Sequence, residues 1–183
     1  MKIITHPHPS LRTIAQPVVT VDKQLRKFIQ DLKNTLQQAT NPQGVGLAAT
    51  QVNAKRRIFA TLLDHQLRAF INPEIIDHDN KTTLGPKKDD PYLEGCLSIP
   101  GIYGPVPRYG TIKLQFQTIS GNDLTSQTEI FDDFAARVVQ HELDHLNGVL
   151  FIDYTKRLDL PLYQEDKNTK KLNQLEPSIV DIL

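Results

Sequence analysis

Two parts of the chain carry hydrophobic residues at helical spacing, three or four positions apart. The first part predicts an amphipathic helix over 23–39, with Asp22 as its N-cap. The second predicts a helix over roughly 134–147, which Asp132 or Asp133 would cap and an Asn-Gly pair would end. The apolar positions behind these predictions are Leu25, Phe28, Ile29, Leu32 and Leu36 in the first helix, and Val138, Val139, Leu143 and Leu146 in the second.

Between the two helices the pattern is typical of strands. Residues 56–63 and 67–76 are rich in β-branched and aromatic residues and predict two connected strands. Residues 92–110 mix apolar residues with turn formers, which predicts an extended, bent segment. From Thr111 onward apolar and polar residues alternate, and 124–130 returns as the hairpin partner of that strand.

The remaining segments predict loops and a tail. Residues 41–44 read as a turn, and 77–91 as an exposed loop. The tail, 155–183, is charged, and a short helix is expected around 167–176. We find no internal repeat and no linker, so we expect one domain over 1–183. Strands around two helices without βαβ alternation predict an α+β fold, with antiparallel or mixed sheets packed around the second helix.

Composition excludes several classes of protein. The chain has 183 residues, 39% of them hydrophobic, and 21 basic against 21 acidic side chains. Zero net charge argues against a protein that coats nucleic acid or an anionic membrane, so we expect no direct nucleic-acid reading. No signal sequence or apolar run long enough to span a membrane is seen, and a single cysteine allows no internal disulfide. We therefore expect a cytoplasmic protein with no membrane partner.

The second predicted helix contains the sequence HELDH, residues 141–145. On a helix, positions i and i+4 share a face, so His141 and His145 can offer two imidazoles to one metal ion. Glu142, beside them, is a carboxylate that can take a proton from water at the metal. The pattern predicts a metal-binding helix, against the alternative that it arose by chance.

The third ligand is not given by this motif. A catalytic site usually has three protein ligands and one open position. One protease family places a histidine six residues after the second, but this chain has Phe151 there. Glu165 and Glu176 lie downstream in a polar tail, and Cys96 lies upstream. A lone cysteine is more often a buried small hydrophobe than a ligand, so spacing alone leaves the choice open.

Three blocks together resemble the signature motifs of the peptide deformylase family: GVGLAATQ at 44–51, EGCLS at 94–98 and QHELDH at 140–145. HPSLR near the start, INPEI, VPR and NGVLFIDY are similar to that family too, so the resemblance covers roughly residues 5–155. It implies the removal of the N-formyl group from the formylmethionine of nascent polypeptides in bacteria or organelles, with release of formate.

The resemblance also implies roles for individual residues. Cys96, His141 and His145 would be the metal ligands, and Glu142 the acid and base. Gln51 and the backbone N–H of Leu97 would stabilise the oxyanion. The remaining implied residues are Gly44, Val45, Gly46, Tyr103 and Val138 for substrate binding, and Glu94 and Arg108 as an ion pair behind the ligands. For Val138, core packing is an equal alternative.

The implied cofactor is one divalent metal ion per chain, ferrous iron in the cell, with zinc, nickel or cobalt in preparations. One thiolate and two imidazoles suit all four metals. The implied partners are N-formylmethionyl peptides and nascent chains. Lys167, Lys170 and Lys171 could make a transient ribosome contact, although a solvated charged face is the simpler interpretation.

Two other functions are weighed against this one. A zinc endopeptidase would cleave internal peptide bonds and would need a downstream ligand. A non-enzymatic module with a structural zinc would need four protein ligands, usually several cysteines, whereas this chain has one. An assay for formate distinguishes the first function from the other two.

Overall fold

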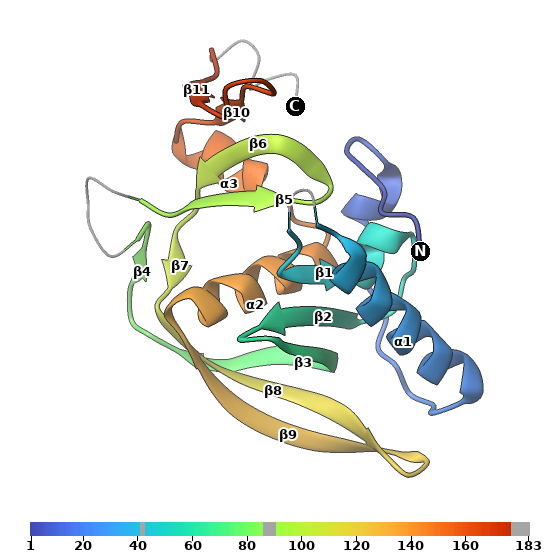
Figure 1. The fold of residues 1–183 in the computed structure, drawn as a ribbon. Helices are drawn as coiled ribbons and strands as arrows, with labels where there is room; N and C mark the ends of the chain where they lie inside the picture. Colours follow the sequence, from blue (N-terminus) through green and yellow to red (C-terminus); the bar gives the residue numbers. More distant parts are fainter. Residues whose placement is uncertain (41–42, 86–90, 177–183) are drawn as a thin grey trace.

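Helix α2 (Asp133–Leu146) lies between two β-sheets, as Figure 1 shows. The computed structural model describes residues 1–40, 43–85 and 91–176. Neighbouring strands within its sheets pair antiparallel, and with the helices they form the mixed α+β fold that the sequence predicts. Helix α1 (Lys23–Gln38) begins where expected, since the Asp22 side chain accepts a hydrogen bond from the backbone N–H of Leu25.

A five-stranded sheet lies on one side of α2, in the order β1-β2-β3-β8-β9. Its strands are β1 (Gly46–Ala48), β2 (Ile58–Leu63), β3 (Gln66–His78), β8 (Thr111–Ser120) and β9 (Asp123–Asp132). The two expected strands and the expected hairpin are thus observed. Because β1 is the end strand of this sheet, its outer edge faces the region of α2 and the second sheet.

The second sheet has four strands, in the order β11-β10-β6-β5. Its strands are β5 (Leu93–Cys96), β6 (Ile99–Pro105), β10 (Tyr163–Glu165) and β11 (Leu172–Gln174); β4 (Thr82–Thr83) and β7 (Arg108–Tyr109) form a separate pair. Residues 92–110 are therefore extended and bent, as predicted. Two short 3₁₀ helices, η1 (Pro9–Arg12) and η2 (Ala49–Val52), complete the N-terminal half.

Both faces of the five-stranded sheet are covered by helices. Side chains alternate along a strand, so Phe59 of β2 points to one face and its neighbours Ile58 and Ala60 point to the other. Phe59 belongs to the core that α2 closes with Val139, and Ile58 packs with the buried leucines of α1. Because both faces of β2 are buried, its sequence is mostly apolar along its whole length. The packing of Val139 against Phe59 also fixes α2 against the sheet.

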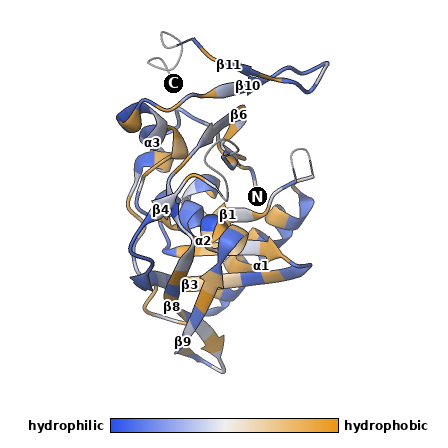
Figure 2. Ribbon diagram, turned by 90° about the vertical axis from the view of Figure 1, so that its left-hand side faces the viewer, coloured by the Kyte–Doolittle hydropathy of each residue, from blue (hydrophilic) through white to orange (hydrophobic). Residues whose placement is uncertain are grey.

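The C-terminal part differs from the expectation in two places. The apolar run after Gly148 forms a third helix, α3 (Phe151–Leu158), in which Phe151 is buried. The prediction of a helix around 167–176 is wrong, because Leu172–Gln174 forms strand β11 and pairs with β10. In Figure 2 this end of the molecule is coloured mostly as hydrophilic, so few apolar residues were available to signal its structure.

The long loop expected at 77–91 is shorter than predicted. Its first residues extend β3 to His78, and Thr82–Thr83 form β4. Residues 86–90 of that loop, and residues 41–42 of the expected turn at 41–44, lie outside the described residues. Among the helices that are described, none combines the length and the apolar character needed to cross a membrane.

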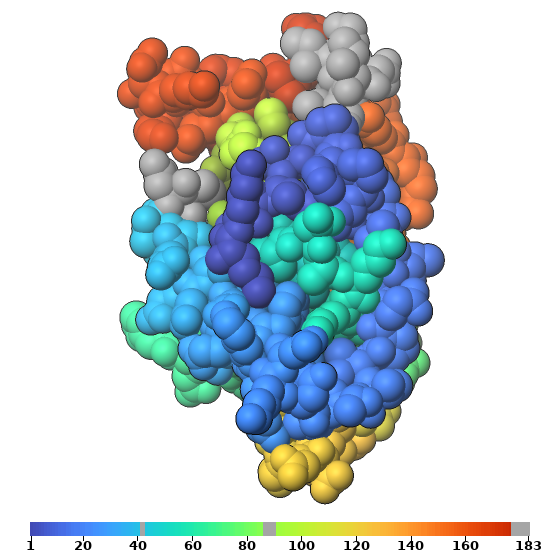
Figure 3. Space-filling view, turned by 90° about the vertical axis from the view of Figure 1, so that its right-hand side faces the viewer, coloured from blue at the N-terminus to red at the C-terminus, as the bar shows by residue number. Residues whose placement is uncertain are grey.

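The N-terminal segment lies across η2, as the dark blue atoms in Figure 3 show. The backbone N–H of Ile4 donates to the carbonyl of Gln51 at 2.9 Å, and the N–H of His6 donates to the carbonyl of Ser98 at 2.8 Å. These bonds connect η2 to the turn between β5 and β6. The first residues of the chain thus hold together two segments that carry predicted site residues.

Candidate active site

Cys96, His141 and His145 come together from two elements. Cys96 ends β5, and the histidines lie on α2 one turn apart. One ligand atom from each lies within 4.8 Å of the others, and Cys96 Sγ is 3.2 Å from His145 Nε2. The pairing of β5 with β6 shifts register between Gly95 and Cys96, an irregularity of the kind that re-aims a side chain. The upstream cysteine, rather than a downstream glutamate, is therefore the third group of this cluster.

His141 is oriented by Glu94. Its Nδ1 lies 2.9 Å from Glu94 Oε2, which leaves Nε2 to face the cluster. Burial opposes the charged form of both groups, but the Arg108 guanidinium holds the pKa of Glu94 well below its usual range. A carboxylate that fixes the second nitrogen of a histidine in this way sets the tautomer and raises its basicity as a ligand.

Glu142 lies on the inner side of the cluster and is 3% exposed. Burial raises the pKa of its carboxyl to about 7. Gly46 of β1 lies so close that a Cβ there would be 2.2 Å from Glu142 Oε1, so any larger residue would displace the carboxylate. The glycine is thus required by the position of Glu142, rather than by a turn.

The amide of Gln51 points toward Cys96. Gln51 Oε1 accepts a hydrogen bond from the N–H of Ala48 at 2.7 Å, which fixes which end of the amide faces the site. Its Nε2 then lies 3.5 Å from Cys96 Sγ and 3.2 Å from Ser98 Oγ. Gln51 is 1% exposed, so this donor is held away from bulk water. Ser98 is a contact that the sequence did not single out.

A cavity of about 270 Å³ opens beside these groups. Its walls include every substrate-binding residue expected from the sequence, together with Leu97 and several residues that were not expected. The expected residues are Gly44, Val45, Gly46, Tyr103 and Val138; the additional ones include Gln43, Tyr92, Ile102, Phe134 and Arg137. The side chain of Val138 is on the cavity side of α2, whereas Val139 and Leu143 pack in the core.

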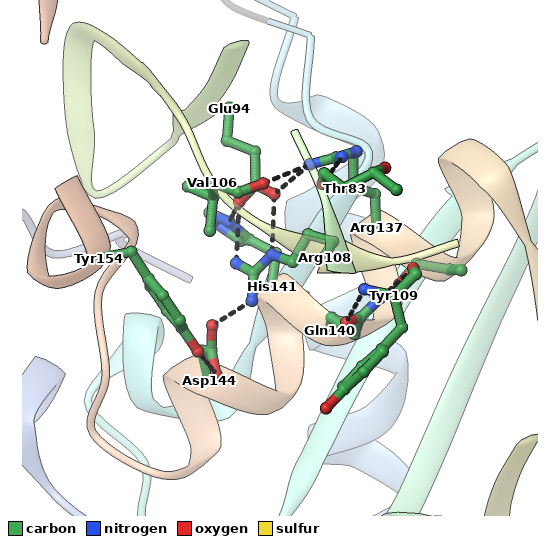
Figure 4. Close-up of polar contacts among 11 residues, drawn as sticks. Thr83, Glu94, Val106, Arg108, Tyr109, Arg137, Gln140, His141, Asp144 and Tyr154 are labelled. Carbon is green, nitrogen blue, oxygen red and sulfur yellow. Dashed lines mark hydrogen bonds and ion pairs between the residues drawn. The ribbon is translucent and has the colours of Figure 1, made fainter. Parts of the chain in front are cut away.

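An ion-pair cluster lies behind His141, as Figure 4 shows. Arg108 donates to both oxygens of Glu94, from Nε and Nη2 at 2.9 Å each, and Nη1 donates to Asp144 at 2.5 Å. The pKa of Arg108 is raised well above its usual value because these two carboxylates outweigh its burial. Asp144 also accepts from the hydroxyl of Tyr154 on α3 at 3.1 Å. Asp144 therefore faces away from the cluster of Cys96, His141 and His145.

The chemistry of the donor set fits a divalent metal ion. One sulfur and two imidazole nitrogens make three protein ligands, the number found in catalytic sites with an open position. Two buried atoms, Glu142 Oε2 and His145 Nδ1, have no hydrogen-bond partner among the described residues. A free carboxylate oxygen beside these three residues is suited to a proton transfer. The single cysteine and the three-residue cluster do not favour a structural zinc site, which needs four ligands.

The model of the polypeptide deformylase family matches residues 1–160. The peptide deformylase of Pseudomonas aeruginosa is 38% identical over 177 residues, which cover 95% of this chain and 95% of the relative. That of Neisseria meningitidis serogroup B is 38% identical over 161 residues, covering 86% and 88%. The crystal structure of peptide deformylase from Thermotoga maritima matches with a TM-score of 0.73 and 38% identity, covering 84% of this chain and 95% of that one.

Fold and site together define a metal-dependent hydrolase. The family match and the identity of the relatives over most of their length specify it further: the chain belongs to the peptide deformylase family. Enzymes of this family remove the N-formyl group from nascent polypeptides. Neither the endopeptidase nor the structural-metal alternative is favoured by these matches.

Proposed function

We propose that this chain hydrolyses the N-formyl amide of an N-terminal formylmethionine and releases formate. The observation that carries the proposal is the convergence of Cys96, His141 and His145 with Glu142 at one end of a cavity of about 270 Å³. In this proposal α2 is the metal-binding helix of the fold, and the amphipathic α1 supports β1 from behind. We propose one catalytic domain, of which the family model covers residues 1–160.

The three clustered residues would hold one divalent ion, for which we propose ferrous iron in the cell, with zinc, nickel or cobalt as substitutes in preparations. Such an ion lowers the pKa of water and polarises a carbonyl group. The thiolate of Cys96 makes this donor set prone to oxidation, so we expect activity to fall in air.

Glu142 is the proposed acid and base. It takes a proton from the attacking water and returns it to the amine of the leaving peptide. Its free oxygen and its burial support this role, because a buried carboxyl with a pKa near neutrality can both accept and release a proton. Glu94 and Arg108 would act through His141 by holding its ring in place.

Negative charge develops on the formyl oxygen during attack. The Nε2 of Gln51 is aimed at this end of the cavity, and the N–H of Leu97 follows Cys96 directly in the chain. We propose that both donate to that oxygen. Loss of one such donor typically lowers the rate about 10²–10³-fold.

The peptide would lie in extended form along the open edge of β1, at Gly44, Val45 and Gly46, with its first side chain near Tyr103 and Val138. Nascent chains are the proposed partners, which places the activity in the bacterial cytoplasm, with an organelle as the alternative. A ribosome contact through Lys167, Lys170 and Lys171 stays a prediction; Lys170 pairs with Glu165 within the tail.

The test is formate release from a formyl-Met-Ala-Ser peptide by iron- or nickel-loaded protein kept free of oxygen. The expected products are formate and Met-Ala-Ser, with no cleavage of internal bonds in the mass spectrum. A protein that retains its metal but releases no formate would refute the proposal. Cys96→Ser should lose the metal on dialysis, and normal metal retention and turnover by that variant would remove Cys96 from the ligand set.

A further inference from the structure

One face of α2 lines the cavity with four residues: Phe134, Arg137, Val138 and His141. They follow the spacing i, i+3, i+4 and i+7, which places them along one stripe of a helix. Phe134 is 52% exposed and lies at the outer end, whereas His141 belongs to the ligand cluster. Arg137 places a cation between the apolar side chains of Phe134 and Val138, although only 7% of it is exposed.

Arg137 is held in place mainly by backbone carbonyls. Its Nη1 donates to the carbonyl of Val106 at 2.8 Å, and its Nη2 to the carbonyl of Thr83 at 2.8 Å. The ring of Tyr92, another cavity residue, lies over the guanidinium at 5.3 Å. These contacts, part of which Figure 4 shows, fix the group at the cavity wall without neutralising its charge.

The charge of Arg137 is less compensated than that of Arg108. Arg108 forms close ion pairs with Glu94 and Asp144, whereas the nearest carboxylate oxygen to Arg137 Nη1 is Glu94 Oε1 at 3.4 Å. A guanidinium has five N–H donors, and within the described part of the chain Arg137 makes three contacts to oxygen. Donor capacity is therefore left on a side chain that lines the cavity.

The distance between Arg137 and His141 along α2 can be compared with the length of the substrate's first side chain. Arg137 precedes His141 by four residues, about 6 Å along the helix axis, since each residue rises about 1.5 Å. This is comparable to the reach of an extended methionine side chain from the amide that reacts beside His141. Arg137 also lines the same cavity as Tyr103 and Val138, beside which the first side chain of the substrate is proposed to lie.

From this placement we infer that Arg137 gives the pocket a polar end, so that the enzyme also accepts N-formyl peptides whose first side chain ends in an acceptor oxygen, with methionine sulfoxide as the representative substrate. The inference rests on the proposed function. The thioether of methionine is a weak acceptor and fits the apolar walls, whereas the sulfinyl oxygen can accept a charge-assisted hydrogen bond. The hydrolysis itself is unchanged.

The first experiment compares three peptides on the metal-loaded wild-type enzyme: formyl-Met-Ala-Ser, its norleucine analogue and its methionine sulfoxide analogue. With a donor at the pocket end, kcat/KM for the sulfoxide should stay within about tenfold of that for methionine. Without a donor, the buried sulfinyl oxygen is unpaired and the loss should be about 10- to 100-fold or more. A loss of more than about tenfold in the wild type would overturn the inference without any variant.

The second experiment uses Arg137→Met, which removes the donors and keeps an unbranched side chain. It should lower kcat/KM for the sulfoxide by about 10- to 100-fold more than for methionine or norleucine, and mainly through KM, because the bond to the sulfinyl oxygen exists before and during the reaction. Arg137→Lys, which keeps one cationic donor group, should recover part of this difference.

The matched control is Gln140→Leu. Gln140 also anchors α2, through two hydrogen bonds to the backbone of Tyr109, but its side chain is not part of the cavity wall. This variant should lose stability while the ratio of sulfoxide to methionine activity stays the same. If Arg137→Met lowers activity on all three peptides equally, as Gln140→Leu would, Arg137 is only an anchor and the inference fails. If no peptide releases formate, the proposed function fails instead.

Discussion

The region around α2 and the tail beyond α3 are built in different ways. In the first, segments 44–51 and 94–98 reach α2 from different sheets, and Gln51, Glu94 and His141 are each held by hydrogen bonds to their neighbours. In the second, β10 and β11 extend the edge of β6 by backbone pairing, and all three residues of β11 are exposed. A substitution near α2 therefore disturbs a set of interdependent positions, whereas one in β11 meets mostly solvent.

In this chain, a site where most substitutions should be costly lies close to a sheet edge where most substitutions should have little effect. Glu142 and His145 are 3% and 1% exposed, so their neighbours cannot relax into water after a change. Surface substitutions away from such features usually change stability by less than about 0.5 kcal/mol. If the contrast holds, substitutions beside Glu142 should have the largest effects and substitutions in β11 the smallest.

Glu142→Gln should have the largest effect. The amide keeps the shape of the side chain but cannot take and return a proton, so kcat/KM for formyl-Met-Ala-Ser should fall about 10²–10⁴-fold. Metal content and the unfolding midpoint should stay near those of the wild type. Measured formate release at a normal rate, in a folded and metal-loaded variant, would exclude Glu142 as the acid and base.

Gly46→Ala should come next. The added methyl group would lie 2.2 Å from Glu142 Oε1 and 2.7 Å from its Cδ, so the carboxylate must move. A misplacement of about 1 Å can cost about 10²-fold in rate. The control is Gly110→Ala, where the nearest atom to a new Cβ is the flexible Asp79 Oδ2 at 3.1 Å. Equal kcat/KM for the two variants would show that Gly46 does not constrain Glu142.

Glu94→Gln should mainly affect stability and metal affinity. It leaves the buried Arg108 with one carboxylate partner and weakens the support of His141, so unfolding free energy should drop by about 3–5 kcal/mol. Metal affinity should fall about 10- to 100-fold. Urea unfolding and competition with a chelator measure the two effects.

The matched control for that variant is Glu129→Gln. Glu129 pairs with Arg68 at 2.5 Å, but the side chain of Glu129 is 38% exposed and that of Arg68 is 35% exposed. The loss should stay below about 1 kcal/mol, as for other exposed pairs. A Glu94→Gln protein no less stable than this control would mean that the buried cluster behaves like a surface pair.

The same contrast explains what the sequence could predict. Periodicity predicted helices at 23–39 and 134–147, and the structure has them at Lys23–Gln38 and Asp133–Leu146. These helices carry long, regular apolar patterns because they pack against a sheet. His141 and His145 could be singled out by their i, i+4 spacing on a helix, whereas Cys96, which the structure brings to them, was singled out only by the family resemblance.

The features that were missed depend on distant neighbours. The run containing Phe151 is too short to distinguish a helix from a buried strand, so α3 was not predicted. Strand β11 exists because β10 offers it an edge, which no local pattern shows. Arg137 was overlooked because an arginine in a helix is normally solvent-exposed; its spacing of four residues before His141 was the available signal.

Two leucines of the tail give the finest test, because they separate its anchored part from its exposed part. Leu162 is fully buried in the core beneath β6, and a Cβ on Gly104 would lie 2.6 Å from its Cδ2. Leu162→Ala should therefore cost about 2–5 kcal/mol in unfolding free energy. Leu172, in β11, is 43% exposed, and Leu172→Ala should cost less than about 0.5 kcal/mol with kcat/KM unchanged. If urea unfolding shows an equally large loss for both, β11 is as firmly packed as the site region, and the boundary between the two regions lies beyond Leu172.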